Sequence, residues 1–244
     1  MRVLLTNDDG IEGIGLRLLA SWARKLGQIT VVAPSEEKSA CSQSIVLRRP
    51  FAFRKSHVLS DLGIEAYTAD ATPADCVRIA AAKLGHFDLV LSGINAGYNT
   101  GHFIAYSGTC AAIFEAAYQN MPAIGFSAHS KTIQEAAEEL DRIWDFFTAN
   151  RLLDQCSIFN VNIPERFSDF RITRQEEAFC HDVFLDEGDE RFLAKLDLTE
   201  WEARKKDLND DMDAFFAGYC SITPLKTDRT DTAVFENLKV LNKD

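Results

Sequence analysis

The N-terminal stretch decides the fold: residues 3–34 read VLLTNDDGIEGIGLRLLASWARKLGQITVVAP. Val3–Leu5 and Ile29–Val32 are short apolar runs, which are typical of buried strands. Between them, residues 13–26 carry apolar side chains at helical spacing, and Gly27 ends this pattern. A strand, a helix and a strand in so short a span form a βαβ unit, so the two strands are expected to be parallel.

The same alternation continues along the chain. Further strands are expected at 64–68, 89–91, 123–126, 158–163 and 219–223, and further helices at 72–84, 110–118, 133–147 and 232–241. The polar stretches 35–44 and 93–109 are expected to be loops. Residues 175–213 are highly charged and lack periodicity, which indicates an insertion, an arm or an irregular hairpin. The pattern predicts one α/β domain over 1–244, with a mostly parallel sheet and an elaborated C-terminal extension over about 165–244.

Composition excludes several classes of protein. The 244 residues include 26 Lys and Arg against 37 Asp and Glu, a net charge of −11, and 46% are hydrophobic. This balance is that of an ordinary globular chain, not of a disordered, collagen-like or small disulfide-rich one. The acidic charge argues against binding a nucleic-acid polymer, which needs a clustered cationic surface. A single nucleotide remains possible, because local dipoles and a metal can hold one phosphate.

The cysteines and the N-terminus indicate a cytoplasmic protein. Six cysteines are present and none forms a Cys-x-x-Cys pair, so free thiols in a reducing compartment are expected. The first apolar run is too short for a secretory signal and ends in two acids. No apolar run reaches the roughly 18 residues of a membrane span.

Polar side chains follow three of the predicted strands. Asp8 and Asp9 follow the first strand, Ser39 lies in the loop after the second, and Asn95 follows the strand at 89–91. In an open parallel sheet, ligands bind at the carboxyl ends of the strands, near the point where the strand order reverses. We therefore expect these side chains to meet at one edge of the sheet.

The acid pair allows two interpretations. Asp-Gly is a common turn pair, so Asp8 and Asp9 could belong to a solvated turn that caps a helix. Two neighbouring buried carboxylates would instead need a cation, and a turn at Gly10 would let both converge on it. With the hydroxyl of Ser39 and the amide of Asn95 they form a set of hard oxygen ligands, which favours Mg²⁺ or Mn²⁺ over zinc. Open positions on that ion could hold water and a phosphate oxygen.

A long glycine-rich loop precedes the helix expected at 110–118. Residues 97–101 read GYNTG and residues 106–109 read YSGT. Glycines let backbone N–H groups approach an anion, and the N-terminus of the helix adds a positive dipole. The alternative is a plain Ser or Thr helix cap with turn glycines. The length of the loop favours a functional role, because long ordered loops in compact domains are usually functional.

Other polar groups are expected to lie at the surface. His102 lies within the long loop but is expected to be exposed. A short basic run is expected on a solvated edge, and an acidic cluster is expected to be exposed charge, since it lacks the glycine and the terminal Glu of an EF-hand loop. These residues are Arg48, Arg49, Arg54 and Lys55 in the basic run, and Asp207, Asp210, Asp211 and Asp213 in the acidic cluster.

Several of these motifs together resemble the SurE family of survival-protein nucleotidases. The motifs are NDDG at 7–10, Ala33-Pro34 with Ser39 downstream, SGINAGYNTGHFIAYSGT at 92–109, TPADCV at 72–77 and GYCSITPL at 218–225. The resemblance extends from residue 3 to about 231. The chain departs from the family pattern at Ala40, where the family usually has glycine, and at 180–213, which lack the aromatic pattern of the family's projecting hairpin.

The resemblance implies a fold, an activity and a site. The fold would be Rossmann-like, with three αβα layers, in a homodimer or homotetramer whose C-terminal third exchanges contacts between subunits. The activity would be a phosphomonoesterase that uses one divalent cation per subunit, acting on nucleoside 5′-monophosphates, often on 3′-monophosphates and sometimes on polyphosphate. The family's metal ligands correspond to Asp8, Asp9, Ser39 and Asn95. Its phosphate-binding residues correspond to Asn99, Ser107, Gly108 and Thr109.

Three hypotheses follow for the chemistry. The first is hydrolysis by metal-activated water, with Asp8 or Asp9 as the catalytic proton acceptor. The second is an aspartyl-phosphate intermediate on Asp8, which is disfavoured because the acids in that chemistry are usually spaced by one residue. The third is a nucleotide-sensing module without turnover, and the paired acids argue against it, because binding an anion alone needs no carboxylates beside it.

Overall fold

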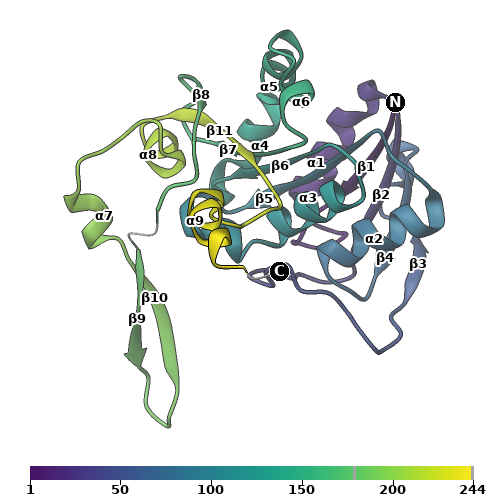
Figure 1. The fold of residues 1–244 in the computed structure, drawn as a ribbon. Helices are drawn as coiled ribbons and strands as arrows, with labels where there is room; N and C mark the ends of the chain where they lie inside the picture. Colours follow the sequence, from purple (N-terminus) through teal and green to yellow (C-terminus); the bar gives the residue numbers. More distant parts are fainter. Residues whose placement is uncertain (178–179, 243–244) are drawn as a thin grey trace.

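A nine-stranded sheet forms the centre of the computed structural model, which describes residues 1–177 and 180–242 (Figure 1). Its strand order is β3-β4-β2-β1-β5-β6-β7-β11-β8. The strands from β4 to β7 are parallel, and β3 and β11 run antiparallel to β4 and β7. The strands are β1 Arg2–Thr6, β2 Gln28–Pro34, β3 Phe53–Ser56, β4 Glu65–Ala69, β5 Leu89–Ala96, β6 Ala123–Ala128, β7 Ile158–Ile163, β8 Asp169–Ile172 and β11 Tyr219–Leu225.

The strand order reverses at β1. Val3 is paired with Ile29 of β2 on one side and with Leu89 of β5 on the other. The chain from β1 to β4 therefore builds one half of the sheet, and the chain from β5 onward builds the other half. The carboxyl ends of β1 and β5 flank this switch point, where ligands bind in folds of this kind.

Helices cover both faces of the sheet, which confirms the three-layer αβα fold. Side chains alternate along each strand, so Leu5 and Val31 face one core cluster while Leu4 and Val32 face the other. The helices on the first face are α1 Ile14–Ala23, α4 Ile133–Glu138, α5 Leu140–Ala149 and the short α6 Leu152–Gln155. Those on the second face are α2 Pro73–Leu84 and α3 Gly108–Tyr118.

The start of α2 shows why the local sequence predicts it correctly. Thr72 accepts a hydrogen bond from the backbone N–H of Asp75 at 3.2 Å, and the Asp75 side chain accepts one from the N–H of Thr72. Pro73 takes the first helical position, where its missing N–H costs nothing. This reciprocal capping box fixes where the helix begins.

The structure differs from the sequence prediction in several elements. The strand expected at 89–91 continues as β5 to Ala96, into the stretch that was expected to be a loop. The helix expected at 133–147 is two helices, α4 and α5, which meet at Glu139. Both halves bury the same face, with Ile133 and Ile143 in one core, so the helical period continues through the break. The strands β3 and β8 were not predicted, because they lie at the edges of the sheet and carry no buried apolar run.

The C-terminal third both completes the sheet and projects from it. The strands β8 and β11 extend the sheet, whereas β9 His181–Asp186 and β10 Phe192–Asp197 form a separate antiparallel hairpin that extends away from the body (Figure 1). Phe184 and Phe192 on this hairpin are exposed. The remaining helices are α7 Thr199–Ala203, α8 Asp211–Phe216 and α9 Thr232–Leu238. A hairpin is thus present within 175–213, and two short helices follow it.

The expectation of exposed charge at the acidic cluster was wrong for three of its members. Asp210, Asp211 and Asp213 are buried at the start of α8. The partners of Asp210 and Asp211 include groups distant in sequence: Arg174 donates to Asp210 and the backbone of Glu176 to Asp211, both from the segment after β8. No local pattern around residue 210 reveals these contacts.

Two further expectations concern the thiols and the membrane. All six cysteines are free thiols. Within residues 1–177 and 180–242, no helix combines the length and the apolar character that crossing a membrane requires.

Candidate active site

A cavity of about 410 Å³ opens at the switch point of the sheet. It lies where the loops that follow β1, β2 and β5 meet, as predicted. The residues that line it are Asp8, Asp9, Glu37, Ser39, Ala40, Asn95, Ala96, Tyr98, Asn99, Phe103, Tyr106 and Ser107. Six of the eight predicted site residues are therefore in its wall. The other two, Gly108 and Thr109, lie directly behind Asp8.

Asp8 is fixed by the first turn of α3. Its Oδ1 accepts a hydrogen bond from the Thr109 hydroxyl at 2.6 Å, and its Oδ2 accepts one from the Thr109 backbone N–H at 3.1 Å. Burial raises the pKa of Asp8, and the hydrogen bonds from Thr109 oppose that shift. A Cβ at Gly108 would come within 2.7 Å of the Asp8 Cβ, so only glycine permits this approach.

Asp9 shares the cavity with Asp8 because the chain turns sharply after it. Asn7 Nδ2 donates to the carbonyl of Gly10 at 2.8 Å, and Gly10 has a φ of +92°, which favours glycine. The turn expected at Gly10 is therefore present. Burial and, to a smaller extent, the negative charges of Asp8 and Glu37 raise the pKa of Asp9, and a hydrogen bond from the Ala96 backbone N–H lowers it; together they bring this pKa to about 6.

The two neutral oxygens come from separate loops. Ser39 lies in the polar loop after β2, which is joined to the acid pair by a hydrogen bond from the Lys38 N–H to the Asp8 carbonyl at 2.7 Å. The Ser39 hydroxyl donates to Glu37 Oε1 at 2.6 Å, so its lone pairs stay available as acceptors. Asn95, at the end of β5, donates its Nδ2 to the Gly97 carbonyl at 2.8 Å, which leaves Oδ1 for a cation.

Ala40 stands where the family usually has glycine, and the structure shows how the loop accommodates it. Its φ of +52° lies in the left-handed region that favours glycine. The loop therefore keeps the backbone path that a glycine would adopt freely, at a cost of roughly 1 kcal/mol for the alanine.

The glycine-rich loop is anchored at both ends. Asn99 donates its backbone N–H to Asn162 Oδ1 at 2.7 Å, and its carbonyl accepts from Asn160 Nδ2 at 2.6 Å. At the other end, Ser107 caps α3 by accepting from the Cys110 N–H at 3.1 Å. The N-terminus of α3, a helix of 11 residues, thus adjoins the acid pair.

Sequence reasoning missed several residues of the cavity wall. Glu37 adds a third carboxylate, and its place in the same polar loop as Ser39 was the available signal. The aromatic rings of Tyr98, Phe103 and Tyr106 also line the cavity. Tyr98 also lines a neighbouring cavity of about 530 Å³, whose wall includes two phenylalanines of α8, Phe215 and Phe216.

The described side chains in the lining of the cavity include negatively charged groups and no positively charged one. Three carboxylates line it, and none of its lining residues, all in the described part of the chain, is Lys, Arg or His. His102, which was expected to be exposed, is half-buried and packs on Phe103, with ring centroids 4.3 Å apart. The basic residues at 48, 49, 54 and 55 are exposed as expected. Within the described ranges, no group of three His, Cys, Asp or Glu side chains is arranged to hold a metal ion. A cation in this cavity would therefore be held by the carboxylates of Asp8 and Asp9 together with neutral oxygen atoms.

The fold and this cavity define the class of protein: a doubly wound α/β protein with paired carboxylates at its switch point, beside the N-terminus of a helix. Comparison with known proteins then identifies the family. The family model described as survival protein SurE matches residues 3–182, and the chain belongs to this family. The resemblance inferred from the motifs is thereby confirmed.

Relatives match the chain over nearly its full length. It is 35% identical to 5′-nucleotidase SurE 1 of Thermus thermophilus, over 99% of this chain and 98% of the relative. It is 36% identical to 5′-nucleotidase SurE of Histophilus somni, over 94% of each chain. The solved structure of the SurE protein from Aquifex aeolicus superposes with a TM-score of 0.79 at 28% identity and covers both chains completely.

Proposed function

We propose that this protein is a metal-dependent phosphomonoesterase that hydrolyses nucleoside 5′-monophosphates to nucleoside and phosphate. The observation that carries this proposal is the cavity at the switch point, where three carboxylates gather without a basic side chain in the lining. Asp8 and Asp9 would hold a divalent cation there, whose positive charge would offset their own charges and that of a bound phosphate. The names of the full-length relatives, 5′-nucleotidase, support the same substrate class.

The residues present fit one Mg²⁺ or Mn²⁺ ion per subunit. Asp8, Asp9, Ser39 and Asn95 all line the one cavity, and all offer hard oxygen atoms. Two adjacent carboxylates that are largely removed from water repel each other, and a divalent cation relieves this repulsion. The donor set lacks the His and Cys ligands that zinc prefers.

Each group then has a separate task in hydrolysis. A bound divalent cation supplies positive charge that stabilises the phosphoryl oxygens and favours ionisation of a nearby water. Both oxygens of Asp8 already accept hydrogen bonds from Thr109, so Asp9 is the better-placed acceptor for the proton of the attacking water. The Ser107 hydroxyl, which accepts from the Cys110 N–H but has no acceptor for its own proton among the described residues, would donate to the phosphate, and the dipole of α3 would stabilise the charge that develops on it.

Phosphate release tests this proposal directly. Wild-type protein is incubated with AMP or GMP and Mn²⁺, then with EDTA in excess, and inorganic phosphate is measured. We expect turnover that EDTA abolishes and Mn²⁺ restores. Tight binding of AMP without phosphate release would support the nucleotide-sensing alternative instead. 3′-AMP and short polyphosphate, used in the same assay, determine how broad the substrate range is.

We also propose a homodimer or homotetramer in the cytoplasm. Apolar side chains are exposed on the β9–β10 hairpin and at the C-terminus, and a second copy would cover them. They include Val183, Phe184, Leu185, Phe192 and Leu193 on the hairpin, and Val234, Phe235, Leu238, Val240 and Leu241 at the C-terminus. The six free thiols support a reducing compartment.

A further inference from the structure

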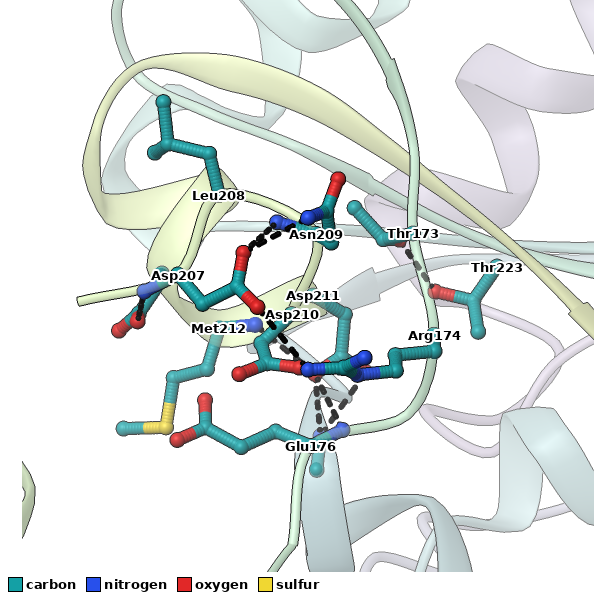
Figure 2. A network of polar contacts seen from close by, with 12 residues as sticks. Thr173, Arg174, Glu176, Asp207, Leu208, Asn209, Asp210, Asp211, Met212 and Thr223 are labelled. Atoms are coloured by element: carbon teal, nitrogen blue, oxygen red, sulfur yellow. Dashed lines mark hydrogen bonds and ion pairs between the residues drawn. The ribbon is translucent and has the colours of Figure 1, made fainter.

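Asp211 is a buried carboxylate that the proposed reaction does not use. It begins α8, and its side chain is fully removed from solvent. Figure 2 shows it at the centre of a polar network between α8 and the segment after β8. Its Oδ1 accepts hydrogen bonds from the backbone N–H groups of Met212 at 2.8 Å and of Glu176 at 3.1 Å.

The same carboxylate reaches the glycine-rich loop. The N–H of Gly101 donates to both Asp211 oxygens, at 3.1 Å and 3.0 Å. The carbonyl of Gly101 accepts from Gln175 Nε2 at 2.9 Å, so both peptide groups of this residue are held by the C-terminal third of the chain. Gly101 also has a φ of +53°, which few other residues adopt easily.

Gly101 lies in the middle of the loop that faces the cavity. It follows Asn99 by two residues and begins the 3₁₀ turn Gly101–Ala105, which leads to Ser107. Asn99 is held by β7, and Ser107 caps α3. Where the loop runs between these two ends therefore depends on how Gly101 is held.

We propose that Asp211 is a positioning residue of the active site: its carboxylate holds the Gly101 N–H and so fixes the path of the loop between Asn99 and Ser107, where Phe103 and Tyr106 line the cavity. Asp211 does not line the cavity and touches no substrate. Its role is to hold the backbone rather than to supply charge. The kinetic consequence rests on the proposed function, whereas the effect on the loop does not.

The neighbouring acid provides a matched control. Asp210 is buried on the same helix end and accepts a hydrogen bond from Arg174 Nε at 2.7 Å. No hydrogen bond of Asp210 reaches the loop between Asn99 and Ser107 within the described residues. An Asp210→Ala variant therefore disturbs the same helix end but leaves Gly101 held.

The kinetic test compares three variants with the wild type, on AMP and Mn²⁺, well below the melting temperature of each. Asp211→Ala removes the acceptor for Gly101, and we expect kcat/KM to fall about 10- to 100-fold, as for a small displacement of binding groups. Asp211→Asn should lose less activity, about threefold, because its Oδ1 still accepts hydrogen bonds whereas its NH₂ group replaces one of the two oxygens to which Gly101 donates. Asp210→Ala should stay within about twofold.

Two results would overturn the role of Asp211. One is a folded Asp211→Ala protein with unchanged kcat/KM. The other is an equal loss of kcat/KM in Asp211→Ala and Asp210→Ala, which would show general destabilisation. If Asp211→Ala does not fold, Asp211→Ser replaces it with the same expectation, because the serine hydroxyl is too short to reach Gly101.

Hydrogen exchange separates this inference from the proposed function. Amide exchange of the peptide spanning 97–107 is measured in the absence of any nucleotide. We expect the fastest exchange in Asp211→Ala, a smaller increase in Asp211→Asn and no increase in Asp210→Ala. If the wild type releases no phosphate, the proposed function fails, yet this measurement still decides whether Asp211 holds the loop. Unchanged exchange in Asp211→Ala would refute the proposal.

Discussion

The chain contains two places where aspartates stand side by side, and they have opposite surroundings. Asp8 and Asp9 open onto a cavity whose lining, within the described residues, includes a further carboxylate and no basic side chain. Asp210 and Asp211 lie at the start of α8 and are enclosed by partners. Asp210 pairs with Arg174, and Asp211 accepts hydrogen bonds from three backbone N–H groups.

Burial alone does not distinguish these two acidic sites. Removal from water raises the pKa of Asp9 to about 6 and that of Asp211 to about 7. A perturbed carboxyl is therefore a weak indicator of an active site in this molecule. What separates the two sites is the presence of cationic side chains: Arg174 pairs with Asp210 beside α8, whereas no described residue in the lining of the cavity is Lys, Arg or His. We infer that the carboxylates of Asp8 and Asp9 bind a cation, whereas those of Asp210 and Asp211 already have their partners within the protein.

The substitution Asp9→Asn should have the largest effect in this comparison. It removes one charged oxygen ligand and the proposed proton acceptor, so we expect the rate of phosphate release from AMP to fall about 10³-fold. The melting temperature should stay the same or rise, because one of two repelling charges is gone. Glu36→Gln, an exposed change in the loop that carries Ser39, serves as the control. Full Mn²⁺-dependent activity in Asp9→Asn would rule out the proposed site.

Asp211 should make folding sensitive to pH. Its folded pKa of about 7 lies above its ordinary value of 3.8, so the folded state binds a proton more tightly than the unfolded state. The stability that this proton contributes is present at low pH and is lost as pH rises through 7. At about 1.4 kcal/mol per pH unit up to the folded pKa, the loss between pH 5 and pH 7 is about 3 kcal/mol, and little more is lost by pH 8. Asp211→Asn should remove it.

Urea unfolding at pH 5 and at pH 8 measures this difference. Cys110 and Asp210 interact with Asp211 and are present in both proteins, so the comparison of wild type with variant isolates the titration of Asp211. We expect the variant to gain stability relative to the wild type at the higher pH. A constant difference between the two proteins across this range would show that Asp211 keeps an ordinary pKa.

Asp213→Ala should lower the stability of the protein and leave its activity unchanged, which is the opposite of what we expect for Asp9→Asn. This buried carboxylate accepts hydrogen bonds from Trp201 Nε1 at 3.0 Å, from Arg204 at 3.0 Å and from the Asp207 N–H at 2.7 Å. Its removal leaves three buried donors with fewer partners, and we expect unfolding to become easier by about 3 kcal/mol. The value of kcat/KM on AMP should not change at a temperature where the variant is folded. A large loss of activity with unchanged stability would contradict the division between the two sites.

The helices and strands could be predicted wherever buried side chains produce a periodic spacing of apolar residues in the sequence. The apolar strand at Val3–Leu5 and the capping box at Thr72 are local signals, and both elements lie where expected. The break at Glu139 leaves no mark, because α4 and α5 bury one continuous face. Edge strands such as Phe53–Ser56 are half exposed, so their pattern is that of a loop.

The candidate site could be predicted to the extent that parallel strands bring their ends together. That rule places Asp8, Ser39 and Asn95 in one cavity, and the structure agrees. Asp211 could not be found in this way. Its partners, Gly101 and Glu176, are brought to it by the path of the C-terminal third, which the sequence pattern does not specify.

Binding of a cation provides the smallest of the expected effects and the most direct contrast between the two acidic sites. A ligand that binds only the folded state stabilises it by about 2.7 kcal/mol at 100 times its Kd. We therefore expect Mn²⁺ to raise the melting temperature of the wild type and of Asp210→Ala, but not of Asp9→Asn. NaCl at equal ionic strength controls for screening of the net charge. We expect the cation at Asp8 and Asp9 because their cavity offers no cationic partner among the described residues. An equal rise of the melting temperature in Asp9→Asn, with no rise in Asp210→Ala, would place the cation at α8 and contradict this expectation.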